Sequence, residues 1–520
     1  MRRRRQAATG EPTALPGGGV PDPAAALGPE GRAGLRGTTH EPTASMSAAV
    51  VSGAKWSTSA RLVTQAMQFL VGLLLARLLL PEDFGLVASV YVISGFAVMF
   101  FELGLGAALI QRSTISERDM STVFWVNALG GILFAALLAA AAPLVASFYG
   151  QAELVTLTPL VALAFTLSVG VVHSALLQRR LAFKTVAQIE VAAAVLGHAT
   201  TVTAALAGAG AYALVYGPLV TSAAASVGSF AAVRWVPRHF ISPTSLRELW
   251  RFSGGLLGFN VVNYWGRNVD NLLVGRELGA APLGLYNRAY NLMLLPIAQI
   301  TGALGRVMFP ALSAMQGDYA RMRTAYLRAL RITNALAVPM LLGLAATAEG
   351  LVPLLWGPNW DATIPLLQIL CLAGVPQCIG SSTGWLYQAT GRTTLMFLMG
   401  AIGTVLAVVL IVVGLRWGVV GVAVAVLARY WVMMPVGVHV AGRAVGLKVR
   451  TVLAHAGPTF AAAGVMGLLV WGLPEVLALD RRAVPVVVGQ VALGVLVYVG
   501  TMLLVARSLV AEVRGVLRRR

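Results

Sequence analysis

Long apolar segments follow one another from about residue 50 almost to the end of the chain, with only short polar breaks between them. A helix that crosses the hydrocarbon core needs about 20 predominantly apolar residues. No segment shows the roughly ten-residue alternation of an outer-membrane barrel. The pattern therefore predicts an all-α polytopic membrane protein with about fourteen transmembrane helices, at 54–80, 84–110, 121–147, 152–177, 186–207, 211–233, 254–278, 284–313, 326–348, 362–389, 394–414, 418–442, 452–474 and 484–506.

Composition agrees with this prediction. The chain is 58% hydrophobic and 11% charged, whereas soluble domains carry about 25% charged residues. The two cysteines, Cys371 and Cys378, lie in one apolar segment and provide neither a disulfide framework nor a metal-ligand cluster. We expect both to be buried packing residues, and we expect no metal and no cofactor.

The formal net charge of +19 arises from basic residues at the ends of the apolar segments. This distribution argues against nucleic acid as a partner, because no soluble basic patch with aromatic residues is present. Breaks after even-numbered spans, together with the first residues of the ninth span, hold seventeen Arg and Lys residues, whereas breaks after odd-numbered spans hold only Arg416, Arg481 and Arg482. The positive-inside rule therefore predicts an inner (cytoplasmic) membrane protein with both termini in the cytoplasm.

The breaks also predict a domain organisation. The N-terminal region is rich in Gly, Pro and Arg and lacks the apolar stretch of a signal peptide. We expect a disordered tail or a misassigned start codon, since Met46 directly precedes the first span, and a basic arm that binds anionic lipid is the alternative. We expect this tail at 1–50, an N-lobe at 51–233, a cytoplasmic amphipathic linker at 234–253, a C-lobe at 254–442, two further spans at 443–506 and a basic cytoplasmic tail at 507–520.

An internal repeat supports two lobes. LLARLLLPEDFGLV near residue 74 and LLVGRELGAAPLGLY at 272–286 align without gaps at an offset of 199 residues, so that Arg77 matches Arg276 and Gly85 matches Gly284. Both segments end one span at an arginine, for which we expect interfacial snorkelling. Repeats of parallel topology place a substrate site at their interface in many transporters. We therefore predict two pseudo-symmetric lobes around a central cavity.

Polar residues within spans 1, 7 and 8 form stripes that would face this cavity, because polar groups at membrane depth are costly when they face lipid. An excess of arginine over acid predicts an anionic cargo, since the guanidinium fork matches phosphate oxygens. The expected substrate-binding residues are Arg61, Gln65, Gln68, Asn260, Asn263, Arg267, Arg288 and Asn291. The few acids leave Glu102 and Asp270 as candidates for ion coupling. Structural Arg61–Glu102 and Arg267–Asp270 pairs are the alternative.

Three runs, RLLLPEDFGLVAS…FELGLGAALIQR (77–112), LLQRRLAFK (176–184) and NYWGRNVDNLLVGRELGAAPLGLYNRAYNLMLLP (263–296), resemble the Wzx-type polysaccharide exporters. More narrowly, they resemble the colanic-acid and teichuronic-acid branch of the multidrug/oligosaccharidyl-lipid/polysaccharide exporter superfamily. The resemblance implies a flippase that moves undecaprenyl-pyrophosphate-linked oligosaccharide by alternating access for surface polysaccharide (lipopolysaccharide or exopolysaccharide) biosynthesis. It also implies membrane lipids and polysaccharide polymerase and export machinery as partners.

Three other functions stay open at this point. A multidrug cation antiporter of the same superfamily should carry more acids in its cavity and about twelve spans. A lipid II flippase would fit the charge pattern but not the 77–112 run. A membrane-embedded polysaccharide polymerase or ligase would need a large outer loop, whereas the longest outer break, at about 349–361, is short. The chain also lacks Walker A and H-E-x-x-H sequences, so we expect no enzyme activity.

Overall fold

The computed structural model describes residues 43–101, 106, 109–110, 115–242, 261 and 264–505. Residues 1–52 and 53–520 form two separate compact units, and the helix packing described below belongs to the second. Every regular element among the described residues is helical. The predicted all-α fold class is therefore confirmed.

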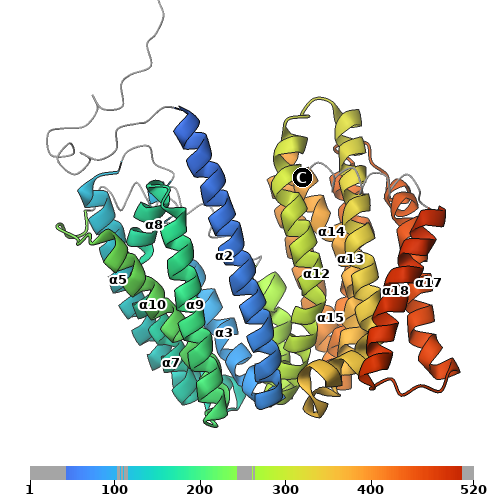
Figure 1. Cartoon of the computed structure of the whole chain (residues 1–520), viewed down its shortest axis with the longest axis horizontal. Helices are drawn as coiled ribbons and strands as arrows, with labels where there is room; N and C mark the ends of the chain where they lie inside the picture. Colours follow the sequence, from blue (N-terminus) through green and yellow to red (C-terminus); the bar gives the residue numbers. More distant parts are fainter. Residues whose placement is uncertain are drawn as a thin grey trace, which may run out of the picture. The chain divides into compact units, whose positions relative to one another are not determined.

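The helices form two bundles that follow each other in sequence (Figure 1). The first bundle contains α2 (Thr43–Leu78), α3 (Pro81–Phe101), α5 (Glu117–Ala140), α6 (Ala142–Tyr149), α7 (Leu154–Leu167), α8 (Val171–Arg179), α9 (Phe183–Leu206) and α10 (Ala213–Val233). The second contains the helical residues 264–278, α12 (Ala280–Ser313), α13 (Tyr319–Trp356), α14 (Thr363–Ala389), α15 (Thr393–Gly414), α16 (Gly418–Gly442), α17 (Val449–Val476) and α18 (Val484–Val505).

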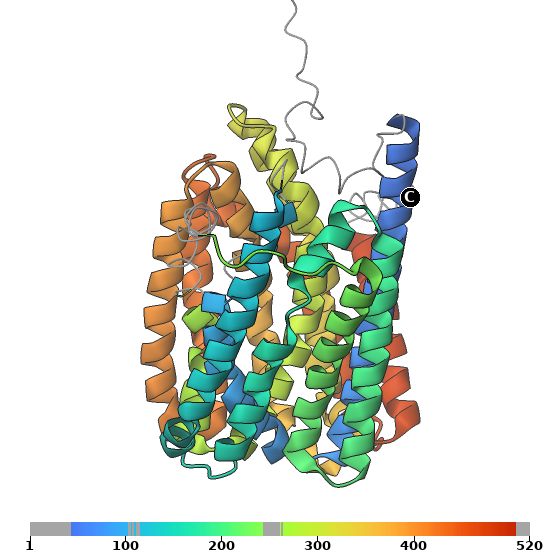
Figure 2. The same cartoon turned by 90° about the vertical axis from the view of Figure 1, so that its left-hand side faces the viewer.

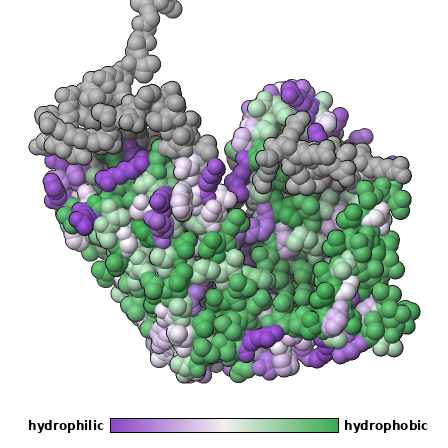
Figure 3. Space-filling model, in the orientation of Figure 1, coloured by the Kyte–Doolittle hydropathy of each residue, from purple (hydrophilic) through white to green (hydrophobic). Residues whose placement is uncertain are grey.

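Eleven helical segments among the described residues are long and apolar enough to cross a membrane. One of them, Thr393–Gly442, contains both α15 and α16 and so covers two of the expected spans. Many large apolar side chains point outward, and Leu468, Leu496 and Leu504 are 71%, 71% and 76% exposed. Such exposure would be unfavourable in water, but lipid tails are as apolar as the side chains themselves. The surface in Figure 3 is accordingly mostly hydrophobic along the helices.

Packing within each bundle is extensive. In the first bundle α9 packs along α10 and α5 packs along α7, and Figures 1 and 2 both show α9 and α10 side by side. In the second bundle α14 packs against α12, α13 and α16, while α17 packs against α13 and α18. The largest apolar core lies mainly in the second bundle, contains the fully buried Tyr286, Met293 and Trp360, and also includes Ala76 of α2.

The connections between helices gather at two ends. We call the end with residues 180–182, 234–242, 314–318, 390–392 and 443–448 the basic end, and the end with residues 79–80, 150–153, 279 and 357–362 the closed end. The basic end is uppermost in Figure 1. The surface is notched between the bundles at this end and continuous at the other, as Figure 3 shows.

Part of the predicted organisation lies outside the described residues, namely the tail before Thr43, the linker from 243 to 253, the start of the C-lobe at 254–260 and the basic tail after 505. The described start of the linker, 234–242, is irregular and begins with Arg234 in the left-handed region at φ 51°. The Trp235 indole Nε1 donates to Glu117 Oε2 at 3.0 Å. The domain boundaries and the amphipathic character of the linker stay predictions.

Candidate functional site

At the closed end the two bundles meet through a pair of glycines. A Cβ added to Gly85 of α3 would lie 1.8 Å from the Ala280 carbonyl oxygen of α12, and one added to Gly284 would lie 1.8 Å from the Pro81 carbonyl oxygen. The offset of 199 residues aligns Pro81 with Ala280 and Gly85 with Gly284. Each contact is therefore the counterpart of the other, which a twofold axis between the bundles requires.

Two arginines related by the same offset cross this junction in opposite directions. Arg77, at the end of α2, donates from Nε to the Leu355 carbonyl oxygen at 3.3 Å and from Nη2 to the Leu354 carbonyl oxygen. Arg276 donates from Nη1 to the Phe148 carbonyl oxygen, and its guanidinium carbon lies 4.6 Å from the centre of the Phe148 ring. We expected both side chains to snorkel to the interface, but each binds backbone of the other bundle instead.

A buried tryptophan completes the closed end. Trp360 is fully buried, its Nε1 donates to the Ala76 carbonyl oxygen at 2.7 Å, and its ring centre lies 5.4 Å from that of Phe84. The segment that carries it is bound by the connection between α17 and α18, where Arg482 Nη2 lies 2.9 Å from Asp361 Oδ2. Hence a residue of the second bundle closes the end of α2.

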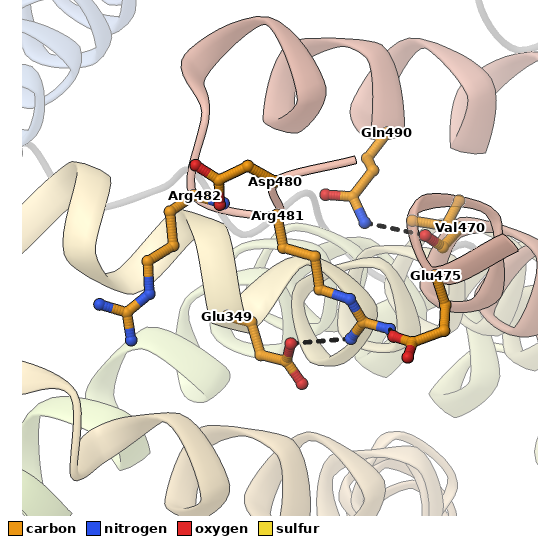
Figure 4. A network of polar contacts seen from close by, with 7 residues as sticks. All are labelled: Glu349, Val470, Glu475, Asp480, Arg481, Arg482 and Gln490. Carbon is orange, nitrogen blue, oxygen red and sulfur yellow. Dashed lines mark hydrogen bonds and ion pairs between the residues drawn. The ribbon is translucent and has the colours of Figure 1, made fainter. Parts of the chain in front are cut away.

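The neighbouring Arg481 organises the same end of the second bundle (Figure 4). Its Nη1 and Nη2 lie 2.7 Å from Glu349 Oε2 and 2.8 Å from Glu475 Oε2. The Arg481 backbone also covers Gly350, where an added Cβ would lie 2.1 Å from the Arg481 carbonyl oxygen. Two of the three basic residues expected on the outer side are thus paired with acids.

Away from the closed end the symmetry between the bundles is broken. Tyr264 Oη donates to the Val92 carbonyl oxygen of α3 at 2.6 Å. The offset of 199 makes Gln65 the counterpart of Tyr264 and Asn291 the counterpart of Val92. Gln65 and Asn291 are both exposed, and the Asn291 amide donates to Asn287 of its own helix. We call the boundary between two helices of different bundles a seam. The seam between α3 and residues 264–278 is closed at Tyr264 and Val92. The equivalent seam between α2 and α12 is open at the counterparts of these residues, Gln65 and Asn291.

Arg288 lies where this opening meets the closed end, one helical turn beyond Gly284. Its Nη2 donates to the Gly72 carbonyl oxygen at 3.3 Å, and its guanidinium carbon lies 4.0 Å from the centre of the Phe84 ring and 6.0 Å from that of Trp360. Its Nε is buried without a hydrogen-bond partner. Among the described residues no carboxylate forms an ion pair with it. A cation with unused donors thus lies at the junction of both bundles.

The other predicted polar and charged residues differ in their surroundings. Arg61, Gln68 and Arg267 are exposed, and no hydrogen bond or ion pair joins their side chains to a described residue. Asp270, 8% exposed, points into the second bundle, where it accepts from Tyr286 Oη at 2.7 Å and from the Asn271 backbone N–H at 2.9 Å. The Arg267–Asp270 pair, given above as the alternative to a functional role, is therefore not formed.

Three predicted residues, Glu102, Asn260 and Asn263, lie outside the described residues. Because Glu102 is one of these three residues, the alternative Arg61–Glu102 pair also lies outside the described residues. No group of three or more His, Cys, Asp or Glu that could hold a metal ion occurs in the described part of the chain. Cys371 and Cys378 are free and buried.

A separate cavity of about 480 Å³ lies inside the first bundle. Its lining includes the hydroxyls of Ser174, Ser222 and Ser226 and the side chains of Gln178 and Glu190. None of the predicted substrate-binding residues contributes to it. Because its walls belong to one bundle, movement between the bundles would not expose it alternately to the two sides of a membrane.

Trp360 was missed by sequence reasoning, because it stands alone in a short polar break without a repeat counterpart or a motif. The roles of Arg77 and Arg276 were missed as well. Their alignment in the repeat was a usable signal, since equivalent residues near a twofold axis make equivalent contacts.

The model of the family described as "Polysaccharide biosynthesis protein" matches residues 74–365 of this chain, more than half of its length. The chain is 28% identical over 351 residues to the teichuronic acid biosynthesis protein TuaB of Bacillus subtilis (strain 168), which covers 67% of this chain and 73% of TuaB. It is 29% identical over 381 residues to the lipopolysaccharide biosynthesis protein WzxC of Escherichia coli (strain K12), with 72% and 77% covered.

Solved structures share the fold. A structure of the lipid II flippase MurJ in an inward closed conformation matches with a TM-score of 0.66 and 15% sequence identity, and covers 88% of this chain and 100% of that chain. A multidrug resistance MATE family transporter of the MOP superfamily, in an inward-facing conformation, matches with a TM-score of 0.56 and 17% identity over 74% of this chain and 98% of that one. Because both sequence identities are this low, the structural matches establish only the shared architecture of two helix bundles.

Proposed function

Because this chain belongs to the family of polysaccharide biosynthesis proteins, we propose that it is a flippase that carries lipid-linked oligosaccharides across the inner membrane by alternating access. In finer terms, the cargo is an oligosaccharide repeat unit on undecaprenyl pyrophosphate. The protein makes and breaks no covalent bond. Relatives named for polysaccharide biosynthesis and its transport support this proposal, among them the succinoglycan biosynthesis transport protein ExoT of Rhizobium meliloti, which is 29% identical over 320 residues.

The observation that carries the proposal is Arg288. Its guanidinium lies between the bundles against a carbonyl oxygen and two aromatic faces, with its Nε unused. A buried cation of this kind gains most from a ligand that brings negative charge and several acceptor oxygens. Pyrophosphate has both properties, and the low local dielectric between helices strengthens the attraction.

The open seam between α2 and α12 supports a cargo with a lipid tail. The headgroup would occupy the space between the bundles, where Gln65, Gln68 and Asn291 offer amide donors and acceptors to sugar hydroxyls. The polyprenyl tail would leave through the seam and stay among the bilayer lipids. The protein would then shield only the polar part of the cargo, which is the part that the hydrocarbon core repels.

The distribution of basic residues supports an orientation with the basic end in the cytoplasm. The closed end would then face outward, and the structure would represent the state that accepts cargo from the cytoplasmic side. In this orientation both termini lie in the cytoplasm. During flipping the two bundles would have to move apart at the closed end and together at the basic end. This movement would break the contacts between bundles at the closed end, which are made by Gly85, Gly284, Arg77, Arg276 and Trp360.

The competing functions differ in the charge that they require between the bundles. A multidrug cation antiporter needs an acid there, and the described acid nearest to this role, Asp270, points into the second bundle, where it is hydrogen-bonded to Tyr286. A lipid II flippase would also use Arg288, so this arginine does not distinguish the two functions. They are distinguished by which lipid-linked cargo the protein moves. A polymerase or ligase would require a large outer domain, whereas the described connections at the closed end are short.

Export in a strain that lacks its native flippase tests the proposal. We expect the parental chain to restore surface polysaccharide, and Arg288→Ala to lower the amount at least tenfold at matched membrane abundance, because a lost charge-assisted contact to phosphate in a dry cleft costs about 1.5–3 kcal/mol. Arg288→Lys should restore little, since lysine lacks the planar fork. Arg61→Ala and Arg267→Ala test the remaining cations in the same assay.

Arg416→Ala is the matched control, because Arg416 is exposed in the connection between α15 and α16 and has no side-chain hydrogen bond or ion pair with a described residue. It should export like the parental chain. Normal surface polysaccharide from Arg288→Ala would contradict the assignment of this arginine to the cargo. Failure of the parental chain to restore any polysaccharide, although it restores growth to cells depleted of a lipid II flippase, would replace the proposed cargo with lipid II.

A further inference from the structure

We infer that Arg77 and Arg276 form a reciprocal latch, in which each bundle holds the C-terminus of a helix of the other bundle and so keeps the closed end shut. The latch is independent of the identity of the cargo. It rests on the alternating access proposed above, because a latch has a function only if the closed end opens.

Arg77 binds a helix end that lacks partners of its own. The last four carbonyl groups of an α-helix have no intrahelical donor, and α13 ends at Trp356. The Gly357 backbone N–H satisfies the Pro353 carbonyl oxygen. The next two carbonyl oxygens, of Leu354 and Leu355, accept from Arg77 of the other bundle. The cation also lies at the negative end of the helix dipole, where positive charge is favourable.

Arg276 binds the first bundle in the same manner. Helix α6 ends at Tyr149, and its cap residue Gly150, at φ 68°, donates to the Ala146 carbonyl oxygen. The Phe148 carbonyl oxygen in this last turn accepts from Arg276, and the Phe148 ring lies beneath the guanidinium. Arg276 thus caps α6 just as Arg77 caps α13.

The two contacts are equivalent by symmetry. Arg77 and Arg276 are related by the same offset of 199 that relates Gly85 to Gly284, and each glycine follows its arginine by eight residues. Any movement that separates the bundles at the glycine contact therefore breaks both caps together.

The exposure of these side chains makes the latch reversible. Both arginines are exposed, and the Arg276 side chain is 43% accessible. Water can therefore replace the carbonyl groups when the end opens, so neither charge is stranded in an apolar environment. Trp360 differs, because it is fully buried and would lose its apolar surroundings on opening. The arginines would thus set the balance between closed and open states without fixing the protein in one of them.

A cysteine reporter inside the junction tests the latch. Leu295 lies two helical turns after Arg288 on the same face of α12 and is 40% exposed, whereas the native Cys371 and Cys378 are fully buried. A Leu295→Cys chain should react with a membrane-impermeant maleimide from the cytoplasmic side, in inverted vesicles, and only slowly from the outer side, in spheroplasts. Addition of Arg77→Ala or Arg276→Ala should raise the outer-side labelling rate about fivefold or more, because each removes contacts that exist only in the closed state.

Four comparisons decide the result. Arg416→Ala, an exposed arginine at the same end without a described cross-bundle contact, should leave the outer-side rate at its parental value. Unchanged outer-side labelling in Arg77→Ala, Arg276→Ala and the double variant, with normal abundance in the membrane, would overturn the latch. A rise in only one single variant would overturn its reciprocity. Rapid outer-side labelling of the parental Leu295→Cys chain would place the closed end in the cytoplasm and overturn both the latch and the orientation. The labelling experiment requires no oligosaccharide cargo. Its result is therefore independent of whether the export assay supports or contradicts the proposed cargo.

Discussion

Gly85 and Gly284 lie against each other where α3 crosses α12, although 199 residues separate them in the chain. Each glycine leaves room for a carbonyl oxygen of the other helix, from Ala280 at Gly85 and from Pro81 at Gly284. Backbone atoms cannot rotate away as a side chain can. The crossing therefore depends on the absence of a Cβ at two symmetry-related positions.

Substitution of these glycines should weaken the contact between the bundles. A Cβ at Gly85 would lie 1.8 Å from the Ala280 carbonyl oxygen, so Gly85→Ala must push the helices apart. We expect a cost of about 1–3 kcal/mol, the usual range for overpacking, and a melting temperature in detergent several degrees below that of the parental chain. Gly284→Ala should have the same effect because its contact is equivalent.

Gly302 provides the control, because it belongs to α12 and has no atom within 4 Å of an added Cβ. Gly302→Ala should melt at the parental temperature or slightly above it, since alanine favours a helix over glycine by about 1 kcal/mol. Equal melting temperatures for Gly85→Ala and Gly302→Ala would contradict the close crossing.

The hydrogen bond between Tyr286 and Asp270 should contribute to stability. Tyr286→Phe removes the hydroxyl donor that lies 2.7 Å from Asp270 Oδ2 and leaves a buried carboxyl oxygen without it. The expected loss is about 1–3 kcal/mol, whereas Tyr216→Phe, at a residue 37% exposed, should have little effect. A double-mutant cycle with Asp270→Ala, which removes the acceptor, measures the coupling. A coupling energy of zero would contradict the hydrogen bond.

Arg481 should matter more than its neighbour Arg482. The Arg481 side chain is 16% accessible and pairs with Glu349 and Glu475, whereas that of Arg482 is 56% accessible and pairs with Asp361 alone. Exposed pairs contribute about 0–1 kcal/mol. We therefore expect Arg481→Ala to lower the melting temperature by several degrees and Arg482→Ala to change it little, with a smaller difference at high salt. The opposite order would contradict these ion pairs, of which Figure 4 shows those of Arg481.

The helical architecture was predictable because the length of an apolar segment directly reflects the thickness of the membrane core. The ends of the helices were less predictable. Helix α13 runs from Tyr319 to Trp356, whereas its apolar pattern predicted 326–348. Its first turns carry Arg321 and Arg323 and continue the helix beyond the apolar segment, where hydropathy no longer indicates it.

The contacts between bundles were only partly predictable. The repeat correctly aligned Gly85 with Gly284 and Arg77 with Arg276, but a sequence alignment does not show which equivalent residues lie near the axis. The spacing of Arg267 and Asp270 indicated a pair along one helix. In the structure Asp270 is instead buried and accepts a hydrogen bond from Tyr286, sixteen residues later in the chain. A buried carboxyl group requires a hydrogen-bond donor nearby, and the Tyr286 hydroxyl is that donor.

Flipping by the purified full-length chain in proteoliposomes tests the central claim most directly. Vesicles would carry an oligosaccharide on undecaprenyl pyrophosphate, and a membrane-impermeant glycosidase would report how much of it reaches the outer leaflet. We predict that the parental chain exposes the inner pool many times faster than protein-free vesicles, and that Arg288→Ala does so at least tenfold more slowly than the parental chain. The account would be contradicted if the chain exposed this lipid-linked oligosaccharide no faster than protein-free vesicles do, while the same preparation moved lipid II or a cationic drug.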